Sequence, residues 1–441
     1  MLFLIHEAFY LLPTEMLIAP GVFRMSDAGL IFVSIFILTI PKTFSLYSEE
    51  TKMICSYILL MILSVLMGSH FFPQSYYEGI LNIRGNFYWL SFFVYIALIK
   101  NIEHAVFVVK VLTLLFGIYT LILIVTKYFP NLGILQLPRN VYSKHSTLKR
   151  FGEVRLFFPY GSIPILFFFI ALVQSINGYI KETFIAKTMR FSFMIIVCIA
   201  IVLSMTRAVI YPALISITFA FITSKKRSVK IAGIVLIVLF ASYQILSISI
   251  STGEESLLDK TIIGKMIFKS TELAEEQGRK LQLNMYLTQF MRSPITGVGN
   301  FAVSRFVNQK DGGVLQSYKA FGFFNGSDMG YLKILAENGL VGIAWVLWWY
   351  FYFYRQGNKL LKVANKLGNI PFVETLVQGL QYFTVYLLFS GVTLAHFVHP
   401  RGITVLPLAL ALMAIARRTV NELAERAAKE APPLFSRMES A

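Results

Sequence analysis

Charged residues are scarce in this chain of 441 residues. Asp, Glu, Lys and Arg together make up 14% of it, whereas soluble domains contain about 25%. Hydrophobic residues make up 56%, and the mean hydropathy is +0.66. Apolar runs of about 18 residues or more recur along nearly the whole chain, which is typical of transmembrane helices. The sequence therefore predicts one membrane domain and excludes a set of soluble domains.

Cysteine and histidine are also rare. The two cysteines, Cys55 and Cys198, lie inside apolar runs, which excludes a disulfide framework and a cysteine-based metal site. Of the six histidines, only His396 and His399 are close together, and they have no third ligand nearby in the sequence. Residues 1–9 lack the basic flank and cleavage site of a signal peptide, so we expect the first apolar segment to be retained. No metal and no cofactor are expected.

Negative charge is scarcer than positive charge, and the formal net charge is +17. The basic residues are dispersed between apolar segments and form no arginine-rich patch with interleaved aromatic residues, so nucleic acid is not an expected partner. Membrane topology and an anionic, lipid-linked substrate explain the excess better.

An all-α, polytopic membrane protein with about twelve transmembrane helices is the predicted fold class. Lys and Arg gather in alternate short loops and in the C-terminal tail, which predicts that both termini are cytoplasmic. The expected divisions are transmembrane helices over 1–249, a large periplasmic loop over 250–328, transmembrane helices over 329–418 and a cytoplasmic tail over 419–441. The predicted spans are residues 2–19, 26–41, 53–72, 83–100, 104–127, 158–178, 189–206, 208–223, 229–249, 330–354, 373–395 and 402–417.

Residues 130–158 break this charge pattern, because they are basic although they are expected outside. The segment has a single acidic residue, Glu153, and an anionic ligand would explain the excess of positive charge. A misplaced span or an ordinary solvated loop would explain it equally. Its basic residues are Arg139, Lys144, Lys149, Arg150 and Arg155.

The segment 250–328 is too long for a simple connection and lacks the composition of a linker. An amphipathic helix is predicted in its middle, with Leu283, Leu287, Phe290 and Met291 on the apolar face, ending at Ser293–Pro294. The helix is expected to lie on the membrane surface.

Arg279 lies four residues before Leu283 and thus on the predicted apolar face. A guanidinium is costly there unless it meets a partner or a ligand. An i,i+4 pair with Glu275 is the ordinary alternative.

Arg207 follows Ser-Met-Thr at the junction of two spans with almost no loop between them. An ionisable residue at this depth is a candidate for function, and a side chain that reaches to a lipid phosphate is the alternative. Gly297 and Gly299 would let the backbone turn sharply or approach a ligand closely.

Asp328 lies at the entrance of the tenth predicted span. It could cap the free backbone donors of that helix. It could instead act as a general base at the membrane surface, accepting a proton from a sugar hydroxyl.

These segments, in this order, resemble the O-antigen ligase and O-antigen polymerase superfamily of bacterial inner membranes. The resemblance rests on Thr206-Arg207 after a span, Gly278-Arg279 before a helix, Ser293-Pro-Ile-Thr-Gly-Val-Gly-Asn-Phe301, and Ser327-Asp-Met-Gly-Tyr-Leu-Lys-Ile-Leu-Ala-Glu-Asn-Gly-Leu-Val-Gly342. It covers residues 150–350 by motif and the rest by hydropathy. It implies an inverting, metal-independent glycosyltransferase whose donor is a glycan on undecaprenyl diphosphate, and whose acceptor is a glycan or a lipid.

The resemblance also implies roles for individual residues. Arg207 and Arg279 match the arginines that hold the diphosphate, and Arg155 matches a more variable basic position. Guanidinium groups suit this task because they bind phosphate bidentately and stay charged. Ligases usually carry a histidine where this chain has Asp328 and an asparagine where it has Met329, while polymerases often carry an acidic form. The departure favours a polymerase and weakens the transfer of the histidine's role to Asp328.

Three functions follow as hypotheses. A polymerase would join lipid-linked repeat units, with a chain-length regulator as a candidate partner. A ligase or protein oligosaccharyltransferase would use the same donor with another acceptor. A transporter or flippase is the alternative from another class, but mid-span charges or paired broken helices from a repeat, which transporters tend to carry, are not evident in the sequence.

Overall fold

The structure is a computed structural model, and the helical parts of the chain that it describes agree with the predicted class. It describes residues 25–39, 48–72, 74–129, 132, 149–150, 153–154, 156, 162–178, 180, 182–204, 206–224, 226–235, 273–300, 329–368, 370–394, 396–397 and 400–430. The larger elements are α3 (Met25–Thr39), α4 (Glu49–Phe71), α5 (Tyr76–Ile83), η3 (Arg84–Leu90), α6 (Ser91–Leu98), α7 (Ile102–Tyr128), α8 (Ile163–Asn177), α9 (Phe184–Leu203), α10 (Arg207–Thr223), α13 (Leu273–Arg292), α15 (Gly330–Lys366), α16 (Pro371–Ser390), α17 (Pro400–Ile403) and α18 (Leu406–Glu430).

Four of these helices, α4, α7, α9 and α15, are long and apolar enough to cross a membrane, and α3, α8 and α10 are shorter apolar helices. A mainly helical, multi-pass protein is therefore confirmed, while the count of twelve spans stays a prediction. The predicted span 2–19 lies outside the described residues. Most of the predicted span 229–249 does as well, and its described part, residues 229–235, is helical.

The prediction of one continuous span over 83–100 is wrong. The chain forms α5, then the 3-10 helix η3, and only then the short helix α6. Trp89 of η3 is fully buried, and Arg84 forms an ion pair of 3.2 Å with Asp27 of α3. A 3-10 helix is tighter than an α-helix and occurs in short segments. Here it accompanies the burial of Trp89 and the ion pair of Arg84.

The segment after α7 contains a short hairpin that the sequence analysis did not predict. Two short strands, β1 (Lys149–Arg150) and β2 (Glu153–Val154), form an antiparallel hairpin in which Arg150 pairs with Glu153. Among the described elements, this hairpin is the departure from an all-α fold.

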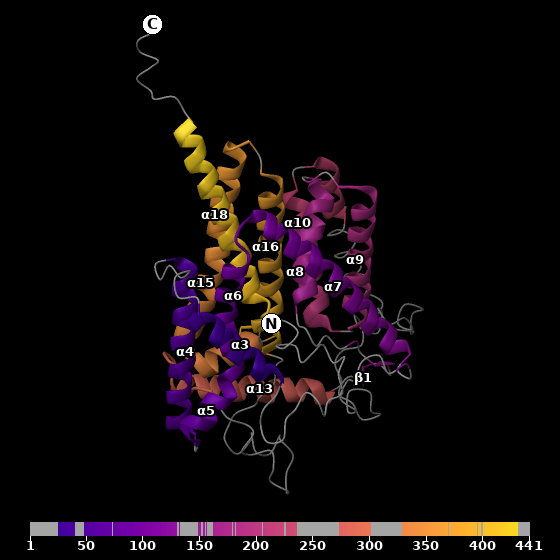
Figure 1. Ribbon diagram of the computed structural model, residues 1–441. Helices are drawn as coiled ribbons and strands as arrows, with labels where there is room; N and C mark the ends of the chain where they lie inside the picture. The colour runs from indigo at the N-terminus through magenta and orange to yellow at the C-terminus, as the bar shows by residue number, and fades with distance from the viewer. Residues whose placement is uncertain are drawn as a thin grey trace, which may run out of the picture.

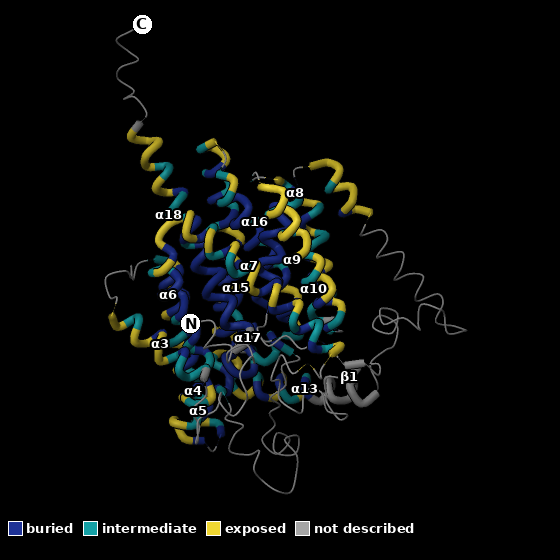
Figure 2. Tube along the Cα trace, turned by 45° about the vertical axis from the view of Figure 1, so that its right-hand side comes forward, coloured by how far each residue is buried: buried dark blue, intermediate teal, exposed yellow. Residues whose placement is uncertain are grey.

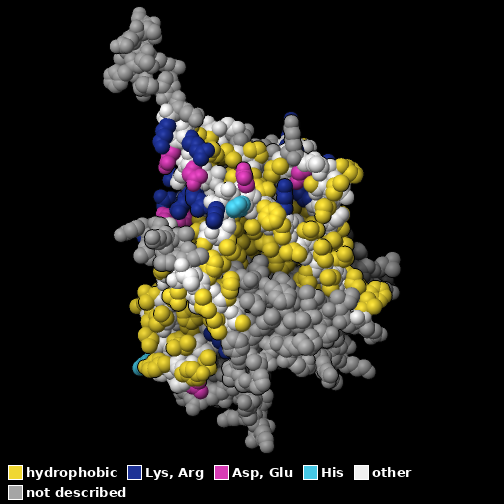
Figure 3. Space-filling model, viewed as in Figure 1, with side chains coloured by type: hydrophobic (Ala, Val, Ile, Leu, Met, Phe, Trp, Pro, Cys, Tyr) yellow, Lys and Arg dark blue, Asp and Glu magenta, His cyan; other side chains and the backbone are white. Residues whose placement is uncertain are grey.

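The helices form a bundle with two different ends (Figure 1). At one end, α13 lies across the bundle near α5 and the start of α15; we call it the α13 end. At the other, α18 runs out to its C-terminal end; we call it the tail end. Buried residues concentrate in the middle, where α16 and the first half of α18 pack (Figure 2). On the face shown in Figure 3, Lys and Arg gather near the tail end above a broad hydrophobic surface.

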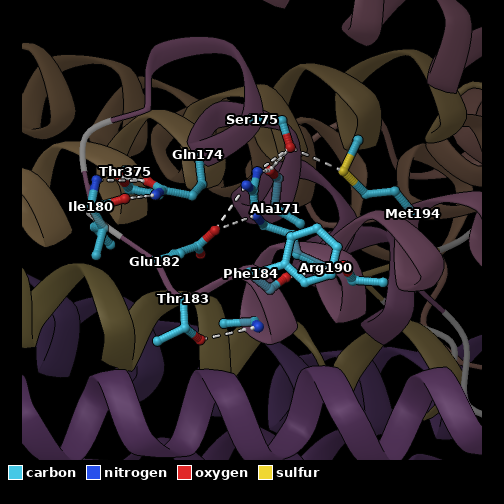
Figure 4. A network of polar contacts seen from close by, with 12 residues as sticks. Ala171, Gln174, Ser175, Ile180, Glu182, Thr183, Phe184, Arg190, Met194 and Thr375 are labelled. Carbon is cyan, nitrogen blue, oxygen red and sulfur yellow. Dashed lines mark hydrogen bonds and ion pairs between the residues drawn. The ribbon is translucent and has the colours of Figure 1, made fainter.

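At the tail end, the connection between α8 and α9 is closed by its own side chains (Figure 4). Arg190 of α9 forms an ion pair of 2.8 Å with Glu182 and also donates to Ser175. The Gln174 amide donates to the Ile180 carbonyl oxygen at 2.7 Å. The connection between α8 and α9 is therefore held by contacts among its own side chains.

Candidate functional site

The turn that follows α13 is the centre of the α13 end. As the Ser293–Pro294 pair predicted, α13 ends at Arg292. The Ser293 carbonyl oxygen then accepts a hydrogen bond of 2.8 Å from the Gly297 amide. A compact turn results, and it brings residues 297–300 back toward the bundle.

This turn inserts into a break in α15. Gly339 has φ 60° and ψ −157°, which no helix contains. The Ala336 carbonyl oxygen accepts from the Val298 amide at 2.9 Å, and the Glu337 carbonyl oxygen accepts from the Gly299 amide at 3.0 Å. Two carbonyl groups that a continuous helix would satisfy internally are thus satisfied by the turn.

The same turn also satisfies the donors on the other side of the break. The Leu340 amide donates to the Pro294 carbonyl oxygen at 2.9 Å, and the Val341 amide donates to the Ile295 carbonyl oxygen at 3.1 Å. Non-helical backbone near membrane depth is tolerated where protein groups replace the lost hydrogen bonds. We call residues 293–300 together with the break at Gly339 the interlock.

Close approach of backbones explains the glycines of the motif. The φ angles of Gly297 and Gly299 are 70° and 82°, in the region that favours glycine. A Cβ atom on Gly297 would overlap the backbone of Glu337, and one on Gly299 would overlap the backbone of Gly68 in α4. The sequence left open whether these glycines allow a sharp turn or the close approach of a ligand. The structure shows a sharp turn and the close approach of backbone from α4 and α15.

The interlock also joins α4 to the site. The Asn300 amide donates to the Ser64 carbonyl oxygen at 3.0 Å. The Gln74 side chain donates to the Asn300 carbonyl oxygen at 2.7 Å. The ends of α4, α13 and α15 are therefore held together mainly by backbone groups.

The side of α13 that packs on the bundle was not predicted from the sequence. Gln282, Tyr286 and Gln289 are buried, whereas Leu287 is 40% exposed and Met291 is 73% exposed. Leu287 and Met291 belong to the apolar face that is expected to meet the membrane surface, and that expectation stays a prediction.

Tyr286 anchors this packing. Its side chain is 1% exposed and packs with Phe72, Val298 and Ala336 in a small separate hydrophobic cluster. Since these residues come from four different segments, α13 is fixed on the bundle by contacts that also hold the interlock.

A buried polar cluster lies beside the interlock. Glu337 is 2% exposed, lies 3.7 Å from the Lys333 ammonium group and bonds with the Asn300 side chain. The Asn82 amide of α5 donates in turn to the Asn300 side-chain oxygen. Burial of a carboxyl group is costly unless it has such hydrogen-bonding and charged partners.

Two further buried polar atoms lie in the segments that form the interlock. Within the described part of the chain, the side-chain oxygens of Gln282 and Asn338 have no hydrogen-bond partner. Buried unpaired polar atoms are rare and mark places where water or a ligand group can bind. The α13 end therefore has buried polar groups that are not satisfied by described residues, as does Asn177 at the end of α8.

Two of the predicted site residues belong to segments at or beside the α9–α10 junction. Arg207 is the first residue of α10. The Leu156 amide, one residue after Arg155, donates to the carbonyl oxygen of Leu203 at the end of α9 at 2.9 Å. The segment of Arg155 therefore lies against the α9–α10 junction, although Arg155 itself and the Arg207 side chain lie outside the description.

The other two predicted residues belong to α13 and to the start of α15. Arg279 lies within α13, one helical turn before Gln282, and its side chain is outside the described part. Asp328 also lies outside it and directly precedes Met329, which packs against the cluster of Tyr286. The roles of Arg155, Arg207, Arg279 and Asp328 stay predictions.

Sequence reasoning missed Glu337, Lys333 and Asn300 as a cluster, although all three belong to the motifs quoted above. The signal was Gly339, an isolated glycine inside a helical pattern, which often has a packing or functional reason. Nothing in the sequence says which segment would fill the resulting break.

A multi-pass helical protein with a helix laid over one end of its bundle, above a polar site, is the class that the fold and the site define. A family model described as O-antigen ligase matches residues 192–347, from α9 through α10 and α13 into α15. The resemblance to the O-antigen ligase and polymerase superfamily is thereby confirmed over the segment that holds the interlock. Among curated proteins, none matches the chain.

Proposed function

We propose that this protein is a polymerase of surface polysaccharide, which joins glycan repeat units carried on undecaprenyl diphosphate. The observation that carries the proposal is the interlock between the turn after α13 and the break in α15, within the segment matched by the O-antigen ligase family. The family supports glycan transfer from a lipid-linked donor at a bacterial inner membrane, and the acceptor is the further step that we infer.

In the proposed reaction, Arg207 and Arg279 bind the donor diphosphate, and the segment of Arg155 adds positive charge beside Arg207. A hydroxyl oxygen of the acceptor sugar attacks the anomeric carbon of the donor glycan. The bond from that carbon to the phosphate oxygen breaks, and the diphosphate leaves with the electron pair. Two guanidinium groups stabilise this developing charge without a proton transfer of their own.

Asp328 is the proposed acceptor of the hydroxyl proton. It precedes the start of α15, which the interlock and the Tyr286 cluster hold in place. Attack from the face opposite the leaving diphosphate gives inversion at the anomeric carbon. Asp328 and Met329 stand where ligases usually carry histidine and asparagine. This difference supports a polymerase, whose acceptor is a sugar hydroxyl of another lipid-linked repeat unit.

The α13 end is the proposed periplasmic end, with residues 250–328 as the periplasmic loop. Lys and Arg gather at the tail end, and short cytoplasmic loops usually carry the excess of these residues. Both termini are then cytoplasmic, and the site faces the compartment in which lipid-linked glycans are assembled.

Purified full-length protein incubated with lipid-linked repeat units alone tests the proposal. Longer lipid-linked glycans are expected, and Arg279→Gln should abolish them. Arg292→Gln is the matched control, because Arg292 is an exposed arginine at the other end of α13. Failure to lengthen the glycan without a second acceptor would overturn the polymerase assignment.

A ligase is the second candidate, because the matched family is described as O-antigen ligase. Adding lipid A core, or an acceptor protein, to the same incubation separates the two. A product that forms only in that mixture identifies a ligase or an oligosaccharyltransferase. Transport stays the candidate from another class, and it would be favoured if Arg207→Ala and Arg279→Ala abolished solute uptake while glycan assembly stayed intact.

A further inference from the structure

Two adjoining cavities lie at the tail end, far from the proposed reaction. The first has a volume of about 530 Å³ and the second of about 370 Å³. Both are lined by Ser48, Arg417 and Asn421, so they form one continuous hollow between α4, α15 and α18. Its two parts differ in chemistry.

Arg355 and Lys359 make the first cavity basic. They are exposed, lie one turn apart on α15, and form no ion pair with any described carboxylate. Like charges at this i,i+4 spacing repel each other, and an anion bound between them relieves the repulsion. Glu49 is the acidic residue that lines the same cavity.

Arg417 is fixed at the boundary of the two cavities. Its Nη2 atom lies 2.8 Å from the carboxylate of Glu50, which is 1% exposed. The Tyr352 hydroxyl donates to the other oxygen of that carboxylate. Glu50 therefore neutralises Arg417, and the first cavity keeps a net positive charge from Arg355 and Lys359 against Glu49.

An apolar wall distinguishes the second cavity. Glu422 and Glu425 of α18 are exposed residues that also line it, and the Arg418 guanidinium in it donates to the Ile99 carbonyl oxygen at 3.1 Å. The residues of the apolar wall are Phe92, Phe93, Ile96, Ala414 and Ile415.

We propose that this hollow binds an anionic phospholipid of the leaflet at the tail end. The headgroup phosphate lies between Arg355 and Lys359, and an acyl chain follows the apolar wall of the second cavity. Basic side chains beside transmembrane helices attract anionic lipids, and the apolar wall favours an amphiphile over a free anion. A headgroup with hydroxyl groups, such as that of phosphatidylglycerol, can also donate hydrogen bonds to Glu49.

The thermal unfolding midpoint of the purified full-length protein in detergent measures this binding. A ligand that binds the native state raises the midpoint in a saturable manner. Phosphatidylglycerol is expected to raise it, while phosphatidylethanolamine and inorganic phosphate at equal concentrations are not. An equal rise with inorganic phosphate, or no rise with phosphatidylglycerol, overturns the proposal.

Two double variants locate the site. Arg355→Gln with Lys359→Gln should weaken the response to phosphatidylglycerol by at least about tenfold, roughly the loss of one charge-assisted contact. Lys362→Gln with Lys366→Gln removes the same charge from exposed positions of α15 that do not line the hollow. An equal loss in both double variants would indicate general attraction to the membrane surface and would overturn the site.

Discussion

The two ends of the bundle are held together by different groups. At the α13 end, the backbone of residues 294–299 replaces hydrogen bonds that the break at Gly339 removes from α15. At the tail end, side chains make the contacts, as in the pair of Glu50 with Arg417 and in the network of Arg190. The comparison teaches that the tail end depends on particular charged side chains, while the α13 end depends on glycine at a few positions.

This difference matters for a reaction that needs fixed geometry. Backbone hydrogen bonds position α13 and α15 relative to each other without long, rotatable side chains. Catalytic groups must be held within about half an ångström of their productive positions. Backbone support of this kind is present at the α13 end, whereas the hollow at the tail end suits a flexible lipid headgroup.

Breaking the interlock should have the largest effect. Gly339→Ala would place a Cβ atom on the Ile295 carbonyl oxygen, at a φ and ψ that essentially only glycine adopts. We expect a loss of about 4 kcal/mol or more in the free energy of unfolding, or failure to accumulate in the membrane.

Gly368→Ala is the matched control for this variant. Gly368 also has a positive φ, 93°, but no heavy atom lies within 4 Å of an added Cβ. A loss of about 1 kcal/mol is expected from backbone strain alone. Thermal unfolding in detergent measures both variants, and equal losses would show that the packing of the interlock contributes nothing.

Breaking the ion pair at the tail end should have the next largest effect. Arg417→Met leaves the Glu50 carboxylate, which is 1% exposed, without its cationic partner. Removal of one partner of a buried pair costs about 3 kcal/mol or more. Glu50→Gln in the same chain removes the stranded charge, so the double variant should recover part of the loss; a double variant that is less stable than the single one would contradict this account.

The positions of most transmembrane helices could be predicted from the sequence. The predicted spans 104–127 and 208–223 agree with α7 (Ile102–Tyr128) and α10 (Arg207–Thr223) within two residues at each end. The length of an apolar run fixes these bounds, because a helix must cover the apolar thickness of the bilayer. The end of α13 was predicted for a similar local reason, a proline that stops the helix.

The interlock could not be predicted, because it is a tertiary contact. Gly297, Gly299 and Gly339 indicate an unusual backbone conformation. A single sequence does not say which other segment of the chain packs against them. The buried face of α13 could not be predicted for the same reason. Gln282 and Gln289 are polar, and they are buried because other segments of the chain pack against them. Motif and charge predicted a common site for Arg155, Arg207, Arg279 and Asp328. Their side chains lie outside the described residues, so this site stays a prediction.

Function should be lost at the α13 end without a loss of stability. Arg207→Gln is expected to lower the rate of glycan lengthening about 100-fold, equal to about 2.7 kcal/mol of transition-state stabilisation. Arg207→Lys keeps the charge but not the paired hydrogen bonds, so it should recover only part of the rate. A rate in Arg207→Gln that equals that of the unchanged protein would remove Arg207 from the site.

A smaller effect is expected from acid at His396, in the turn between α16 and α17. Burial lowers the pKa of His396 to about 4 from its ordinary 6.5, and its Nε2 atom lies 2.7 Å from the Ser390 hydroxyl. Below pH 6.5 the unfolded chain binds a proton that the folded chain does not, so stability falls as the pH drops toward 4. The loss should be about 2 kcal/mol between pH 6.5 and pH 5. His396→Gln should flatten this dependence of stability on pH, whereas substitution of the exposed His70 by Gln should not. If stability falls equally steeply with pH in both variants, burial of His396 does not cause the dependence.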